Sequence, residues 1–126
     1  MVLDACVLIA HLDGADAHHD RARALLLSAA EEPLAASPLS LAEVLVGPAR
    51  AGRFDKAIAA LHQLRVTGVG LGEGAPIRLA VLRARTGLKL PDCCVLLAAE
   101  QAQGAVATFD DRLAAAAGER GFVVRQ

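Results

Sequence analysis

Four acidic residues interrupt apolar stretches of the sequence, where an unpaired charge is costly to bury. These acids are Asp4, Glu43, Asp92 and Asp110. No Lys or Arg lies inside any of these stretches, so no basic neighbour in the sequence neutralises them. Carboxylates persist in such surroundings where a basic partner or a metal ion compensates their charge. We therefore predict that the four side chains converge on one spot and hold a hard divalent cation.

The type of ligand narrows the choice of cation and of reaction. Carboxylate oxygens without nitrogen or sulfur ligands favour Mg²⁺ or Mn²⁺ over zinc. The chemistry that most needs such a site is phosphoryl transfer, in which the cation polarises the phosphate and activates a water molecule. The acids are therefore typical of an enzyme that acts on phosphate esters.

Each acid also has a purely structural interpretation. Asp4 could cap the turn after a strand, and Asp92 could be stabilised by the dipole of a helix N-terminus. Ser40 and Glu43 have the spacing of a capping box, and Asp110 or Asp111 could be the N-cap of the last helix. The conjunction favours the metal site, because four independent caps would not all need to interrupt apolar runs.

The remaining reactive residues give weaker signals. His18 and His19 are adjacent, so on a helix they would point about 100° apart and make a poor ligand pair. Cys93 and Cys94 are adjacent as well, which suits neither a disulfide nor zinc, and we predict that both are core residues. The alternating glycines between residues 68 and 74 lack the Gly-Lys-Ser/Thr of a phosphate loop, and we expect a plain strand-to-helix connection.

Composition excludes several classes of protein. The 126 residues fit one domain, and 55% hydrophobic residues with a mean hydropathy of +0.43 suggest that a partner covers some apolar surface. The chain has three Phe and no Trp or Tyr, so it offers almost no aromatic surface on which bases of a single strand could stack. Its net charge of −1 does not fit the broad basic surface of a high-affinity nucleic-acid binder. Three cysteines without Cys-x-x-Cys spacing favour a reduced cytoplasm, and no apolar stretch is long enough for a membrane span.

Short apolar runs alternate with Ala- and Leu-rich helical segments, which is typical of a parallel sheet covered by helices on both faces. We predict strands at Val2–Asp4, Leu34–Ala36, Val66–Val69, Ala105–Ala107 and Val123–Val124. We predict helices at Asp16–Ala30, Ser40–Leu45, Phe54–Leu64, Gly74–Thr86, Pro91–Gln103 and Asp111–Ala117.

These elements would bring the acids to one edge of the sheet. Ligands of open parallel sheets gather at the carboxyl ends of the strands, where Asp4 ends the first strand and Asp110 follows the fourth. Asp92 shares a helical face with apolar residues and should point toward the sheet. Glu43 stands in a mostly apolar helix that offers little solvated face.

With these four acids in this order, the chain resembles a PIN-domain nuclease, in particular the toxin of a VapC-type toxin–antitoxin pair. The resemblance covers nearly the whole chain and rests on four motifs in order: Leu3-Asp4-Ala5-Cys6-Val7-Leu8-Ile9, then Ser37, Ser40 and Glu43, then Leu90-Pro91-Asp92, then Thr108-Phe109-Asp110-Asp111-Arg112-Leu113. It implies a single three-layer α/β/α domain over residues 1–126, with a five-stranded parallel sheet.

The resemblance also implies a Mg²⁺-dependent endoribonuclease, with Mn²⁺ as the other candidate ion, that a cognate antitoxin holds inactive. Asp4, Glu43, Asp92 and Asp110 match the acidic quartet of the family. We expect Ser40, Asp111 and Arg112 to support this site, with Ser40 supplying a hydroxyl near Glu43. The chain departs from the family at Cys6, where Ser or Thr is common. This departure concerns a hydroxyl contact and not the ligand set itself.

Two kinds of partner follow from the apolar excess and the acidic site. We expect a second copy of the chain to cover an apolar helical face and form a homodimer, and an Arg-bearing antitoxin segment to cover the acids. The substrate would be RNA, met by scattered cations such as Arg85, Lys89 and Arg112, whose default interpretation is a solvated surface.

Two other functions stay open. A catalytically silent PIN-like binding module would keep the fold without turnover. A phosphoacceptor receiver domain also gathers acids at strand ends, but it needs an acidic pair after the first strand and a late Lys. Here Ala5 follows Asp4, and neither Lys56 nor Lys89 stands at the end of a late strand.

Overall fold

A five-stranded parallel sheet forms the centre of the computed structural model, which describes residues 1–126. Its strand order is β3-β2-β1-β4-β5, so the first strand lies in the middle. Each strand is two residues long, and all five lie at or within one residue of the predicted runs. The strands are β1 (Val2–Leu3), β2 (Ala35–Ala36), β3 (Thr67–Gly68), β4 (Val106–Ala107) and β5 (Val124–Arg125).

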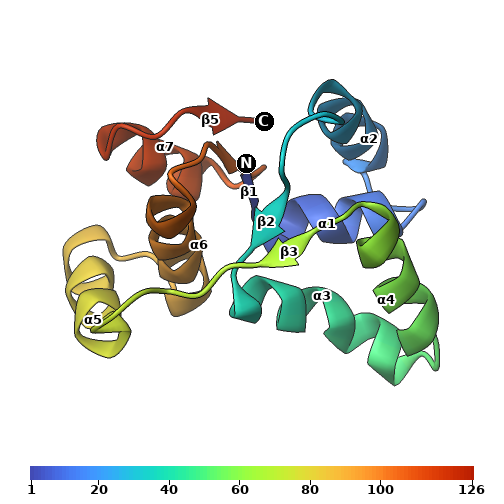
Figure 1. Ribbon diagram of the computed structural model, residues 1–126, viewed down its shortest axis with the longest axis horizontal. Coiled ribbons are helices and arrows are strands. Elements are labelled where there is room, and N and C mark those ends of the chain that lie inside the picture. Colours follow the sequence, from blue (N-terminus) through green and yellow to red (C-terminus); the bar gives the residue numbers. More distant parts are fainter.

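Helices cover both faces of the sheet, as Figure 1 shows. The helices α5 to α7 lie on one side and α1 to α4 on the other. Their bounds are α1 (Ala5–Leu12), α2 (His19–Ser28), α3 (Pro38–Arg50), α4 (Phe54–Gln63), α5 (Ala75–Thr86), α6 (Leu90–Ala102) and α7 (Asp111–Glu119). None of them is both long and apolar enough to cross a membrane.

The register of the strands divides the core into two layers. Val2 pairs with Ala35 and Val106, and all three are buried against α5, α6 and α7. The next residue on each of the three strands, such as Leu3, faces the opposite way and packs with α1 to α4. Successive strand residues alternate between faces, so two buried residues per strand are enough to fill both layers. The predicted three-layer α/β/α fold is confirmed.

The helix α1 was missing from the predicted elements. The run Cys6–Ala10 is entirely apolar and carries β-branched residues, so it shows no polar face from which a helical period can be recognised. In the structure most of α1 is buried between the sheet and α2, and only Ile9 is exposed among its apolar residues. The helix forms because tertiary packing covers nearly all of its faces.

Two helices, α2 and α3, have an end that differs from the prediction by more than two residues. The helix α2 begins at His19 and not at Asp16, because the side chains of Asp13 and Asp16 accept hydrogen bonds from the N–H groups of Ala15 and His18 and hold turns before it. The helix α3 extends from Pro38 to Arg50 and continues through Pro48.

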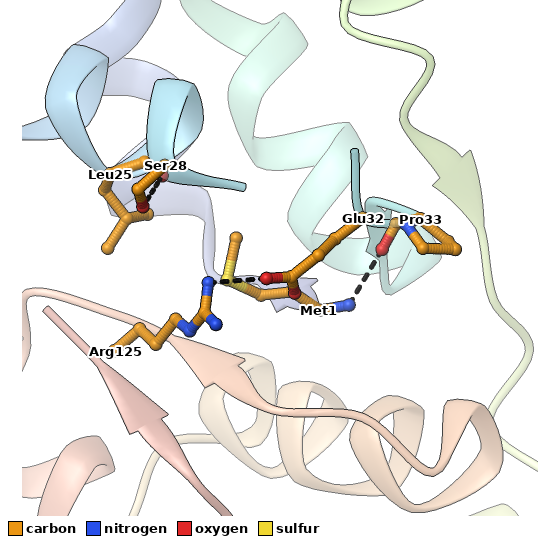
Figure 2. A network of polar contacts seen from close by, with 6 residues as sticks. All are labelled: Met1, Leu25, Ser28, Glu32, Pro33 and Arg125. Carbon is orange, nitrogen blue, oxygen red and sulfur yellow. Dashed lines mark hydrogen bonds and ion pairs between the residues drawn. The ribbon is translucent and has the colours of Figure 1, made fainter. Parts of the chain in front are cut away.

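The first and last strands are tied to the loop that precedes β2, as Figure 2 shows. The ammonium group of Met1 donates a hydrogen bond of 2.8 Å to the carbonyl oxygen of Pro33. Arg125 forms an ion pair of 2.8 Å with Glu32. Both partners of that pair are partly exposed, so the pair is worth at most about 1 kcal/mol. These contacts join segments from both ends of the described chain.

Candidate active site

Two of the predicted site residues lie beyond the carboxyl ends of neighbouring strands, at the same edge of the sheet. Asp4 directly follows β1, and Asp110 lies shortly after β4. Because β1 and β4 are parallel neighbours, the chain passes from both strands to one side of the sheet. This is the edge at which open parallel sheets bind ligands.

Asp4 is nearly buried, and two side chains fix its orientation. Thr108 Oγ1 donates a hydrogen bond of 2.7 Å to Asp4 Oδ2, and Cys6 Sγ donates one of 3.0 Å to the same oxygen. The carboxylate makes no capping hydrogen bond to α1, so its interpretation as a simple cap is wrong. No hydrogen bond from the protein reaches Oδ1, which leaves this oxygen available for a ligand.

Thr108 is a functional candidate that the sequence reasoning missed. Its side chain is completely buried, and Oγ1 also accepts a hydrogen bond of 3.0 Å from the N–H of Asp110. One hydroxyl therefore links two acids of the predicted quartet. The available signal was a lone hydroxyl in the apolar run just before Asp110.

Cys6 holds Asp4 through its thiol, which lies close enough to donate to the carboxylate. Burial, and then the charge of Asp4 and its hydrogen bond, raise the pKa of the thiol to about 12. The thiol is therefore protonated at neutral pH and acts as a donor to Asp4. Its sulfur also accepts a hydrogen bond from the N–H of Phe109 at 3.3 Å, which joins the start of α1 to the loop after β4.

Asp110 is the N-cap of α7, so that structural interpretation is confirmed. Its Oδ1 accepts hydrogen bonds from the N–H groups of Arg112 and Leu113. The cap occupies one oxygen only, and Oδ2 receives no hydrogen bond from the protein. Asp111 is exposed, and its Oδ1 accepts a long hydrogen bond of 3.5 Å from Gln126 Nε2. It makes no hydrogen bond that involves another acid of the quartet.

Asp92 and Glu43 complete the acidic cluster from two helices. Asp92 stands in the first turn of α6 and is half-buried. Burial, followed by the charges of Asp4 and Asp110, raises the pKa of Asp92, against an opposing effect of Lys89. Glu43 lies at an exposed position of α3, so the prediction that it has little solvated face is wrong. Partial burial, and then the charges of Asp4 and Asp92, raise its pKa. Asp92 and Glu43 therefore each lie close enough to two other acids to be affected by their charges.

The proposed capping box between Ser40 and Glu43 is wrong. The helix α3 begins at Pro38, and its N-cap is Ser37, whose Oγ accepts a hydrogen bond from the N–H of Ser40 at 3.0 Å. The buried hydroxyl of Ser40 accepts a hydrogen bond from Ser37 Oγ and makes none to Glu43. Glu43 thus has no structural hydrogen bond in α3 to explain its position.

The four acids lack basic partners, and their side chains are not gathered tightly around one point. The two ion pairs of the protein join Arg78 to Glu100 and Arg125 to Glu32, so none of the four acids has a basic partner. No three His, Cys, Asp or Glu side chains lie close enough together to enclose a metal ion as they stand. The all-oxygen donors and their mutual repulsion fit a hard divalent ion, but the side chains would have to move together to surround it.

Cys93 and Cys94 are buried and reduced, as predicted for core residues. The histidines do not form a ligand pair either. His19 Nδ1 lies 2.8 Å from the carbonyl oxygen of Ala10, whereas His18 packs against the ring of Phe109.

Fold and site together describe an α/β/α domain with an acidic cluster at the carboxyl edge of a parallel sheet. Residues 1–119 match the PIN domain family, and the chain belongs to this family. A receiver domain is thereby ruled out. A comparison of the sequence with curated proteins gave no significant match.

Solved structures with the same fold include three from bacterial pathogens. A toxin–antitoxin complex from Klebsiella pneumoniae contains a chain with 23% identity and a TM-score of 0.74, and the match covers 99% of this chain and 95% of that one. VapC20 of Mycobacterium tuberculosis, a sarcin–ricin loop cleaving toxin, has 19% identity and a TM-score of 0.75, with 97% and 95% covered. FitAcB from Neisseria gonorrhoeae has 22% identity and a TM-score of 0.72, with 99% and 96% covered.

Proposed function

We propose that this protein is a metal-dependent endoribonuclease, using Mg²⁺ or Mn²⁺, and that it is the toxin of a toxin–antitoxin pair. One observation carries the proposal: the charges of Asp4 and Asp110 reach Asp92, and those of Asp4 and Asp92 reach Glu43, within a PIN domain. None of the four acids has a basic partner. Their repulsion raises the free energy of the metal-free protein, and a divalent cation would relieve it. The VapC20 likeness supports RNA as the substrate.

The residues that would hold the ion are Asp4, Glu43, Asp92 and Asp110. When bound, the ion would supply Lewis-acid stabilisation of the phosphate and lower the pKa of a water molecule. The protein contributes rigidity at two of the four positions. Thr108 and Cys6 orient Asp4, and the cap of α7 orients Asp110, so each presents one oxygen without a hydrogen bond.

A second candidate is a catalytically silent PIN-like binding module. It is favoured by the open spacing of the acids, none of which forms a group of three around a common point. Glu43 is exposed, so its side chain is free to change rotamer and approach the other acids. The two candidates differ in whether that approach occurs when Mg²⁺ is added.

Cleavage of RNA by the purified, antitoxin-free protein distinguishes the two candidates. We expect cleavage of total RNA with Mg²⁺ or Mn²⁺, none with EDTA, and none by an Asp4→Asn variant that remains folded by circular dichroism. Glu73→Gln is a matched control, because Glu73 is an exposed acid outside the cluster. Unchanged cleavage in EDTA would refute the metal mechanism. RNA binding without cleavage under every condition would favour the silent module.

The proposed partners are an antitoxin and a second copy of the chain. An Arg of the antitoxin would form charge-assisted hydrogen bonds with the acids and compete with metal and RNA. Ile77 and Val81 lie one turn apart on α5, with 74% and 43% of their surface accessible, which supports burial of this helical face in a homodimer. The free cysteines and the RNA substrate favour the cytoplasm.

These partners can be tested separately. Light scattering should give the mass of a homodimer for the isolated toxin, and a monomer at micromolar concentration would refute this proposal. In the complex, replacing the inserted Arg of the antitoxin with Ala should restore nuclease activity. Inhibition that survives the loss of every antitoxin Arg would refute the Arg segment.

A further inference from the structure

Two cations, Lys89 and Arg112, lie beside the acidic cluster at a single turn between α5 and α6. Lys89 immediately precedes α6 and stands three residues before Asp92. Arg112 follows Asp110 by two residues, and its Nη2 lies 3.4 Å from the carbonyl oxygen of Gly87 in the same turn. Sequence position and side-chain contact thus bring both cations to this turn.

We propose that Lys89 and Arg112 together bind a backbone phosphate of the RNA strand next to the bond that is cut. This inference rests on the proposed ribonuclease function and adds the direction from which the strand enters the site. RNA is a polyanion, so the four carboxylates repel its phosphates. Nearby cations reduce this repulsion on the side where they lie. The two cations reduce it beside Asp92 and Asp110.

The turn between α5 and α6 carries Lys89 and contacts the side chain of Arg112, and several hydrogen bonds hold it in place. Gly87 has a φ of +70°, a left-handed conformation that favours glycine, and its N–H donates to the carbonyl oxygen of Arg83. Leu88 donates its N–H to Thr86 Oγ1 at 3.2 Å, and its carbonyl oxygen accepts a hydrogen bond of 2.9 Å from Arg83 Nη1. A rigid turn loses little conformational entropy when its cations bind a ligand.

Neither cation is committed to an acid within the protein. Lys89 and Arg112 are exposed and take part in neither of the two ion pairs. Lys89 nevertheless lies close to the site, because it is the N-cap residue of α6 and Asp92 stands in the first turn of the same helix. A cation that is close to the acids but unpaired is free to bind a phosphate.

Arg85 provides a natural contrast. It is also exposed and lies on α5, but it lines a separate groove with residues that include Ile77, Leu97 and Arg120. Of the three cations that the sequence suggested for RNA contact, the structure therefore brings two to the acids and turns Arg85 toward another surface. Arg85→Ala removes the same charge without altering the proposed contact.

The test measures binding of a fluorescein-labelled single-stranded RNA by anisotropy across a salt titration, in EDTA and with Ca²⁺. We expect Lys89→Ala and Arg112→Gln each to weaken binding by about two- to fivefold, the range for exposed charge pairs. Each should also reduce the slope of log K against log salt by about 0.7, because one counterion-releasing contact is lost. Arg85→Ala should leave the slope unchanged.

Two further comparisons separate RNA contact from support of the turn. Arg112→Gln keeps a donor for Gly87, whereas Arg112→Lys keeps the charge, so only Arg112→Lys should bind RNA as the wild type does. With Mg²⁺, Lys89→Ala should raise KM and leave kcat nearly unchanged, because it removes binding that is equal in ground and transition states.

The outcomes distinguish this inference from the proposed function. Wild-type protein that does not bind RNA at all would overturn both. RNA binding with an unchanged salt slope in Lys89→Ala and Arg112→Gln, or with the same loss in Arg85→Ala, would overturn the phosphate contact alone.

Discussion

The hydroxyl of Thr108 donates a 2.7 Å hydrogen bond to Asp4 across 104 residues of sequence. Both side chains are buried, and Thr108 is completely inaccessible to solvent. The same oxygen accepts the N–H of Asp110, so the relative positions of two acids depend on one hydroxyl group. Asp4 and Asp110 are therefore held together even without a metal ion.

Thr108→Val tests this link, because Val has a similar shape but no hydroxyl. The buried Asp4 would lose a donor and the N–H of Asp110 would lose its acceptor, so we expect the free energy of unfolding to fall by about 1–3 kcal/mol. Cleavage of RNA should fall as well, because Asp4 would lose its fixed orientation. Chemical denaturation and cleavage rates measure the two effects. Thr108→Ser is the control and should retain most of both, so equal losses in Ser and Val variants would contradict the hydroxyl's role.

Cys6 gives a second test of the same carboxylate. Cys6→Ser keeps a donor for Asp4 and an acceptor for the N–H of Phe109, so we expect cleavage close to that of the wild type. Cys6→Ala removes both and should lower the free energy of unfolding by about 1–3 kcal/mol. The two variants should be compared by thermal unfolding and by Mg²⁺ affinity in calorimetry. If Cys6→Ala matches the wild type in both, the thiol does not position Asp4.

Glu43→Gln tests the one acid of the quartet whose position no structural hydrogen bond explains. As a metal ligand, Glu43 should be needed for turnover, and its loss should slow cleavage by about 100-fold or more, since metal-based charge stabilisation is worth several kcal/mol. The metal-free variant should be no less stable than the wild type, because repulsion from Asp4 and Asp92 is relieved.

Calorimetry with Mn²⁺ and chemical denaturation in EDTA measure both parts of this prediction. Glu31→Gln is a suitable control, since Glu31 is an exposed acid away from the cluster. A Glu43→Gln variant with wild-type rate and wild-type metal affinity would leave Glu43 as an ordinary surface acid.

His11 predicts a dependence of stability on pH that is independent of the acids. Its Nδ1 is buried without a hydrogen-bond partner, and its ring stacks on His19. Burial, and then the charges of His19 and Arg23, lower the pKa of His11 below its usual 6.5. The unfolded chain therefore binds this proton more readily than the folded protein does.

Proton linkage gives the direction in which stability changes with pH. The contribution of His11 to stability is complete above pH 6.5 and is lost as the pH falls from there toward its lowered pKa in the folded state. We expect His11→Gln to flatten the decline in unfolding free energy between about pH 7.5 and about pH 5.5. Urea denaturation across this range measures it. A variant whose pH profile parallels that of the wild type would exclude His11 as the cause.

The sequence allowed the sheet and the acids to be predicted because both leave local signals. Each strand is a short apolar run between helical segments, and Asp92 and Asp110 interrupt apolar runs. The helix α1 left no such signal, because a helix with almost every face covered has no polar stripe.

Other features could not be predicted because they depend on distant or competing contacts. Ser37 and Ser40 compete for the same N-cap, and Pro38 at the first helical position was the overlooked signal that favours Ser37. The bond from Thr108 to Asp4 depends on two strands that meet only in the folded sheet, and no local pattern encodes it.

The position of β1 between β2 and β4 has a consequence for synthesis of the protein. Within this domain Asp4 is synthesised 104 residues before Thr108, so the strand that brings Thr108 and Asp110 beside it emerges much later than β1. Until then one edge of β1 has no neighbour, and the pairing that closes it is among the slowest to form because it spans so much sequence. We expect the two acids to reach their final positions only after nearly all of the domain has been translated, and any activity that needs both acids would begin no earlier.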